Sequence, residues 1–143
     1  LIDRIGISNF EPDQVREAVS LTDAPVFANQ VECHPMLPQE ELRSVCADHD
    51  VEVVAYSPLA RGAVFENETL SSVAAARDVS AAQVSLAWLR EKGVTAIPKA
   101  TSTDHIEDNW ASLDLELTDE EVAAIDDIDV RRREVDPDFG PWN

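Results

Sequence analysis

The sequence predicts an α/β fold built on parallel strands. Four short apolar runs, at residues 5–10, 26–32, 51–57 and 94–99, each end in small polar residues. Stretches with the period of a helix lie between these runs, so strand and helix alternate along the chain. Because parallel strands joined by right-handed crossovers all end at the same edge of the sheet, a cofactor site is expected at that edge.

The first two strands are predicted at residues 1–7 and 26–32. Between them, Pro12 stands where the first turn of a helix accepts proline, and the apolar positions that follow continue a helical stripe. After the second strand, Pro38 opens a further helix, which closes near His49.

The third strand is predicted at residues 51–56, which are nearly all apolar, as in a parallel strand buried on both faces. A loop over residues 58–67 and a helix over residues 68–77 follow. The next helix begins at Ser80, because Gln83 three residues later completes a capping-box pattern.

The last part of the chain repeats this alternation. Gly93 ends the preceding helix, and residues 94–98 form the fourth predicted strand. Thr103 is expected to cap a helix, and Thr118 with Glu121 forms a second capping box.

Two aromatic positions and the tail complete the prediction. Trp88 and Trp110 lie at helical spacing among leucines and are predicted to be core side chains. Residues 131–143 are charged and contain proline, which indicates an irregular surface tail. Its basic run, residues 131–133, is interpreted as solvated rather than as a binding patch.

The composition is strongly acidic, with 29 acidic against 11 basic residues and a net charge of -18. Such a field repels nucleic acid and anionic membranes. It suits a protein kept soluble in high salt, so a halophilic source is the preferred interpretation, with an ordinary acidic cytosolic protein as the alternative. The sequence shows no apolar run of transmembrane length and no signal peptide.

Cys33 and Cys46 are isolated, which favours free, buried thiols in a reducing, cytoplasmic setting. Cys33 and His34 are adjacent, but without a second ligand pair no metal site is predicted. Since the chain starts at Leu1 and its only methionine is Met36, it is expected to be a fragment of something longer.

Neither a GxGxxG nor a GxxxxGKS turn follows any strand, which disfavours Rossmann and P-loop nucleotide folds. An eight-stranded barrel typically needs about 250 residues, so this chain offers roughly half of one. Four segments stand out along the chain: IGISNF (residues 5–10), NQVECHP (residues 29–35), AYSPL (residues 55–59) and IPK (residues 97–99). In order and spacing they resemble the aldo-keto reductases, and most of all their prokaryotic 2,5-diketo-gluconate or aldehyde reductase group.

The resemblance implies the C-terminal half of a (β/α)8 TIM barrel, that is, strands 5–8 with their helices. It implies one partial domain over residues 1–143, with the half barrel at 1–130 and the tail at 131–143. The cofactor implied is NADP(H), with NAD(H) also possible.

The nicotinamide end of that cofactor matches four residues of this chain. Ser8, Asn9 and Gln30 match the positions that hydrogen-bond the carboxamide, whose donors and acceptors suit Asn and Gln side chains. Tyr56 matches the aromatic residue that stacks on the nicotinamide ring.

A second set of residues matches the positions that lie near the phosphate groups of the cofactor. Ser57, Pro58 and Leu59 match the stretch beside the pyrophosphate, and Lys99 matches the lysine at the 2'-phosphate of NADP. A point positive charge on a long stem suits a phosphate.

The rest of the set lies further along the chain. Thr101 and Ser102 offer hydroxyls to the same phosphate, and Asn109 matches a residue that reaches the adenine. His105 stands where the family often has arginine, and Asp108 stands where it has glutamate, which leaves the choice between NADP and NAD open.

The family's catalytic tyrosine, lysine, aspartate and histidine sit on strands expected to be absent, so no catalytic residue is assigned. The resemblance implies an NADP-dependent oxidoreductase that reduces aldehydes or ketones, with this chain as its cofactor-binding half, inactive alone. The alternative is a truncated, non-catalytic half barrel that pairs with itself or with a missing N-terminal half, because unpaired strand edges seek partners.

Overall fold

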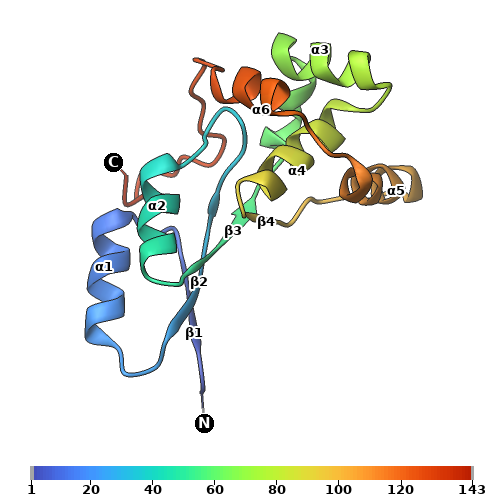
Figure 1. Ribbon diagram of the computed structural model, residues 1–143. Coiled ribbons are helices and arrows are strands. Elements are labelled where there is room, and N and C mark those ends of the chain that lie inside the picture. Colours follow the sequence, from blue (N-terminus) through green and yellow to red (C-terminus); the bar gives the residue numbers. More distant parts are fainter. Residues whose placement is uncertain (1, 143) are drawn as a thin grey trace.

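The computed structural model describes residues 2–142 and contains one sheet of four parallel strands in the order β1-β2-β3-β4. The helices α1 and α2 lie beside β1 and β2, whereas α3 to α6 gather around the β3–β4 end (Figure 1). The strands are β1 (Ile5–Ser8), β2 (Val26–Glu32), β3 (Glu52–Tyr56) and β4 (Thr95–Ala96). The helices are α1 (Pro12–Leu21), α2 (Glu40–Asp48), α3 (Glu68–Arg77), α4 (Ala81–Glu91), α5 (Thr103–Ala111) and α6 (Asp119–Asp126), with 3-10 turns η1 (Ala60–Phe65) and η2 (Ser112–Asp114).

The alternation of strand and helix and the parallel sheet are confirmed, and β2 and α3 have the predicted bounds. The two outer strands are shorter than predicted. β1 begins at Ile5, and Leu1, which the prediction included, lies outside the described residues. β4 covers only Thr95–Ala96 because it pairs with β3 alone, and Pro98 has no N–H to donate to a ladder.

Two of the predicted helix caps are present. At the start of α4 the Ser80 hydroxyl accepts from the Gln83 N–H at 3.1 Å, which is one half of the predicted capping box, whereas the Gln83 side chain donates to Asp108 at 2.6 Å instead of closing the box. At the start of α6, the Thr118 hydroxyl accepts from the Glu121 N–H at 3.2 Å, and the Glu121 carboxylate accepts from the Thr118 N–H at 2.8 Å.

The predicted cap of α5 is wrong by one residue. Ser102, not Thr103, is the N-cap residue, because its hydroxyl accepts from the His105 N–H at 3.3 Å. Thr103 is the first residue of the helix itself.

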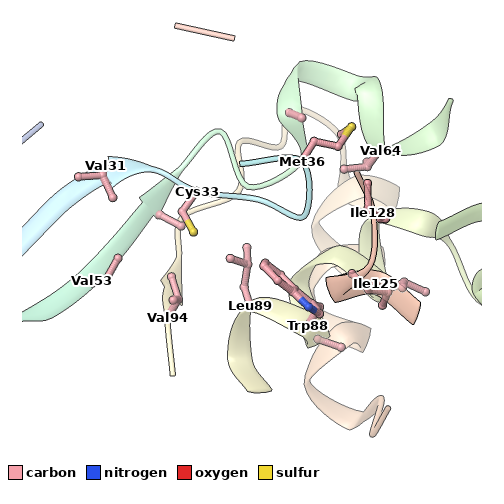
Figure 2. Packing of buried hydrophobic residues seen from close by; sticks show 14 of the residues in the cluster. Val31, Cys33, Met36, Val53, Val64, Trp88, Leu89, Val94, Ile125 and Ile128 are labelled. Atoms are coloured by element: carbon pink, nitrogen blue, oxygen red, sulfur yellow. The ribbon is translucent and has the colours of Figure 1, made fainter. Parts of the chain in front are cut away.

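The hydrophobic core extends from α1 and α2 across the sheet to α3, α4 and α6, and Trp88 is its largest fully buried side chain. Figure 2 shows Trp88 of α4 in this cluster with Leu89 and Ile125. The prediction that Trp110 is also a core residue is wrong, since 71% of it is exposed. A helical stripe shows which face is apolar, but not whether another element covers that face.

The two cysteines are free and buried, as predicted. Burial raises the pKa of the Cys33 thiol to about 12, so the thiol stays protonated and unreactive at neutral pH. Among the helices of residues 2–142, none is both long and apolar enough to cross a membrane.

Candidate functional site at the carboxyl edge of the sheet

The ends of β1 and β2 bring three predicted residues together. Asn9 follows β1 with a φ of 58°, a left-handed conformation that asparagine tolerates better than most residues. Its N–H donates to the Gln30 carbonyl at 2.9 Å, and the Ser8 hydroxyl donates to the same carbonyl at 3.0 Å. The Gln30 side chain is exposed and therefore free to meet a ligand.

Tyr56 joins this group from the end of β3. Its hydroxyl donates to Asn9 Oδ1 at 2.9 Å, so the aromatic ring and the amide are fixed relative to each other. Burial and the Glu32 carboxylate raise the pKa of the Tyr56 phenol, which the Arg133 and Arg61 guanidinium groups partly oppose. Because the raised pKa keeps the phenol protonated at neutral pH, Tyr56 presents an uncharged aromatic ring.

Asn29 supports this arrangement, and sequence reasoning assigned it no role. It is fully buried, its Nδ2 donates to the Phe10 carbonyl at 2.9 Å, and its Oδ1 accepts from the Phe10 N–H at 3.4 Å. These bonds hold the turn that carries Asn9. An amide next to the apolar run Val26–Ala28 of a predicted strand was the available indication, because buried amides are nearly always hydrogen-bonded.

The loop after β3 has an unusual backbone. Ser57, Ala60 and Arg61 have φ values of 47°, 45° and 50°, and Gly62 has a φ of 103°. Such conformations cost of order 1–3 kcal/mol each in non-glycine residues and cluster at ligand sites. The buried Ser85 of α4 holds the loop in place, since its hydroxyl donates to the Pro58 carbonyl at 2.8 Å.

This loop and the end of β4 enclose a cavity of about 310 Å³. It brings the predicted Ser57–Leu59 stretch and Lys99 to one place. It also adds Arg61, a second cation that sequence reasoning did not include. The lining residues are Ser57, Pro58, Leu59, Arg61, Gly62, Phe65, Ile97 and Lys99.

Thr101, Ser102 and His105 lie just beyond Lys99 at the start of α5, and all are exposed. The positive end of a helix dipole favours anions there, although Asp104 in the first turn opposes it. None of these three is among the residues that line the Lys99 cavity or the cavity between α4, β4 and α5.

Asn109 lies elsewhere. It lines a separate, larger cavity of about 510 Å³ between α4, β4 and α5, together with Ile106 and Trp110. Its neighbour Asp108 serves helix packing, because its carboxylate accepts from the Ser80 hydroxyl at 2.7 Å and from Gln83 Nε2 at 2.6 Å. The predicted residues therefore fall into three places. One group is hydrogen-bonded around Asn9 and Tyr56, a second lines the cavity with Lys99, and Asn109 lines a separate cavity.

The fold and this site define an α/β protein of the barrel type, with its polar groups at the carboxyl ends of parallel strands. The aldo/keto reductase family model matches residues 1–130, and the chain belongs to that family. Members of the family act on carbonyl substrates. The four parallel strands make up about half of the family's (β/α)8 barrel.

Three relatives illustrate the match. An aldo-keto reductase of Mycobacterium sp. (strain JLS) is 36% identical over 137 residues, which cover 95% of this chain and 50% of the relative. The crystal structure of a putative 2,5-diketo-D-gluconic acid reductase B has a TM-score of 0.89 at 34% identity, covering 96% of this chain and 50% of that one. A structure of an aldo-keto reductase complexed with NADPH has a TM-score of 0.84 at 29% identity, covering 93% and 44%.

The chain thus spans about half the length of the relatives it matches. In these comparisons the matched half is the N-terminal one, which contradicts the prediction of a C-terminal half with strands 5–8. Four βα units in a row look alike in either half of an eightfold barrel, so the order of strands and helices cannot tell the halves apart.

Proposed function

We propose that this chain binds a nicotinamide dinucleotide, with NADP(H) preferred, as part of a carbonyl oxidoreductase. The observation that carries the proposal is the hydrogen bond between Tyr56 and Asn9, which fixes an aromatic ring beside amide groups at the carboxyl edge of the sheet. A nicotinamide cofactor, when bound, supplies the hydride that reduces a carbonyl carbon. Lys99 and Arg61, which line one cavity, suit its phosphates.

The residues present fit the chemical groups of this cofactor. The amides of Asn9 and Gln30 and the Ser8 hydroxyl offer both donors and acceptors to a carboxamide. The cavity beside Ser57–Leu59 has two cations on its lining, in a chain whose net charge is -18. Local positive charge on such an acidic protein favours a phosphate over a neutral ligand.

Turnover by this chain alone is not expected. Tyr56 is the only tyrosine, and its hydroxyl donates to Asn9 and has a raised pKa, which makes it a poor proton donor. No catalytic residue is therefore assigned, and the carbonyl substrate is left open.

Changing Lys99 to methionine tests the cofactor preference. If Lys99 contacts the 2'-phosphate, NADPH should bind about 10- to 100-fold more weakly, since a hydrogen bond to a charged group contributes about 1.5–3 kcal/mol. NADH, which lacks this phosphate, should change less than about threefold. Both are measured by fluorescence titration at fixed salt concentration.

The matched control is K92M, because Lys92 and Lys99 are the only lysines. Lys92 pairs with Asp126 at 2.6 Å and is not among the residues that line the Lys99 cavity. Equal losses for NADPH and NADH in K99M, or an equal loss in K92M, would remove the role of Lys99 at the 2'-phosphate.

A second candidate function is a non-catalytic half barrel that pairs with another chain. β1 and β4 each have a single neighbour among the described strands, and Ile106, Trp110 and Leu113 expose an apolar surface beside β4. Sedimentation velocity in low and high salt is expected to show self-association that grows with salt, because screening weakens repulsion between chains of charge -18. A monomer at every salt concentration would exclude self-pairing.

A further inference from the structure

The helix α5 presents its apolar face to solvent. Each of the other five helices has at least one buried side chain, whereas α5, whose residues are all described, has none. Polar contacts attach it to α4 instead. The Asp108 carboxylate accepts from the start of α4, and the Arg90 guanidinium donates to the Ser112 carbonyl at 2.6 Å. Since an amphipathic helix normally packs its apolar face on a core, this exposed face indicates an interaction site.

That face borders the cavity of about 510 Å³ between α4, β4 and α5. Ile106, Trp110 and Leu113 form one stripe at positions i, i+4 and i+7, and all three are exposed. The buried side chains of Leu86 and Val94 line the same cavity from the core side. We call this cavity with its stripe the β4 groove, because it runs along the outer strand β4.

The opposite edge of the sheet carries exposed apolar side chains that we call the β1 patch. The patch consists of Ile2 just before β1, Leu21 at the end of α1 and Phe27 near the start of β2. In Figure 1, α1 lies beside β1 and α5 lies beside β4, at the two sides of the sheet. Because helices between parallel strands run opposite to the strands, the β1 patch lies toward the amino end of the sheet, as do Trp110 and Leu113. One edge therefore offers apolar projections, and the other offers an apolar groove at the same end.

The exposed area of the chain also indicates a missing partner. A folded protein of 15.7 kDa exposes about 7,300 Å² by the general scaling of surface with mass. This chain exposes 8373 Å², about 1,100 Å² more than the scaling gives. A standard interface removes about 800 Å² from each partner, so the excess is large enough for a stable contact.

We propose that a second copy of this chain covers both edges, with β1 of each copy lying parallel to β4 of the other and the β1 patch in the β4 groove. Two sheets of four parallel strands then close an eight-stranded barrel without free strand edges. A twofold axis along the barrel makes the two contacts identical, so the assembly stops at two copies. This inference rests on the second candidate function, self-pairing, and does not require a bound cofactor.

The two edges favour this head-to-tail contact over a contact between two α5 helices. An α5–α5 contact would cover the stripe of the β4 groove and leave the β1 patch and the outer edge of β1 exposed. The net charge sets the condition for pairing, because two copies of charge -18 repel each other and salt screens that repulsion. The chain is therefore expected to be a monomer with Trp110 exposed at low salt concentration, and a dimer at high salt concentration.

Charged substitutions at each edge test the arrangement by sedimentation equilibrium at high salt concentration. L21D changes the β1 patch and W110K changes the β4 groove. Each should weaken pairing by at least about tenfold, since each would bury an unpaired charge in both contacts. Both positions are exposed in the single chain, so the fold should be unchanged, as checked by circular dichroism.

The matched controls are V130D and V130K. Val130 is also an exposed apolar residue, but it lies after α6 and lines a cavity beside the start of α3, away from both edges. These two variants carry the same new charges as L21D and W110K. They should change the dimer dissociation constant by less than about threefold.

An equimolar mixture of L21D and W110K tests whether the two edges meet. A mixed pair has one unchanged contact and one contact in which the new carboxylate faces the new ammonium group. The mixture should therefore associate at least about tenfold more tightly than either variant alone. If both variants pair weakly and the mixture pairs no better, the two edges do not face each other and the proposal is overturned.

The remaining outcomes separate this inference from the proposed functions. Loss of pairing in W110K with wild-type pairing in L21D would indicate an α5–α5 contact, which overturns the closed barrel but leaves self-pairing intact. Assemblies larger than two copies would overturn closure. A monomer at every salt concentration would exclude a second copy as the occupant of the β4 groove. None of these measurements uses NADPH, so a failure of cofactor binding would leave their results unchanged.

Discussion

Replacing Trp88 by alanine is expected to lower the free energy of unfolding by about 3–5 kcal/mol, the usual cost of truncating a buried tryptophan. The side chain is 1% exposed and lies in the main cluster with Leu89 and Ile125 (Figure 2). Its Nε1–H donates to Asp126 Oδ1 at 2.9 Å, so the change also removes one of the partners of that carboxylate, which keeps Lys92. Since small domains are stable by only about 5–15 kcal/mol, W88A should remove a large share of the chain's stability.

The matched control is W110A, because Trp110 is also a helical tryptophan but is 71% exposed. Its truncation should change the free energy of unfolding by less than about 0.5 kcal/mol. Urea denaturation followed by circular dichroism gives both values at one low salt concentration. Similar losses in W88A and W110A would mean that the apolar surface at α5 is covered in solution, as it would be in a dimer.

The sequence predicted those parts of the fold whose causes are local. The Ser80 cap and the Thr118–Glu121 capping box depend on residues three apart, and both are present. The strand Val26–Glu32 was also predicted correctly, because its apolar pattern lies within the strand and its bounding turns lie next to it in the sequence. Trp110 was misjudged because its exposure depends on which element packs against α5, and no local pattern records that.

In the candidate site, too, the contacts that follow from local sequence patterns were predicted, and the long-range contacts were not. That Ser57–Leu59 and Lys99 line one cavity follows from the parallel order of β3 and β4, which the sequence predicted. The contact between Glu32 and the tail was not foreseen, since it joins residues 102 and 103 positions apart through backbone N–H groups, which carry no sequence signature. A charged residue at the end of a buried strand was the only hint.

Acidification is expected to release the tail before it unfolds the sheet. Burial alone would raise the pKa of Glu32, but the hydrogen bonds from His34 and from the N–H groups of Glu134 and Val135 outweigh burial and lower it. A carboxyl group whose folded-state pKa is lowered contributes stability above its unfolded-state pKa of about 4.3. That contribution is lost as the pH falls through the folded-state pKa.

The other ionisable groups that interact with Glu32 are His34 and Cys33 on its own segment and Tyr56 on β3. Cys33 and Tyr56 are already neutral at pH 7 because their pKa values are raised. They do not change charge on acidification, so neither of them competes with the loss of the Glu32 carboxylate.

E32Q isolates this effect from the other acidic residues, which all titrate in the same range. At pH 7 the wild type should be more stable than E32Q by about 2–3 kcal/mol, the contribution of hydrogen bonds to a charged acceptor. The gap should narrow below pH 4.3 and close once Glu32 is protonated, because the neutral acid and the amide then offer similar acceptors. Urea denaturation of both proteins at a series of pH values measures it. A gap that stayed constant through this range would mean that Glu32 is neutral in the folded chain, and that the tail is held by something other than its charge.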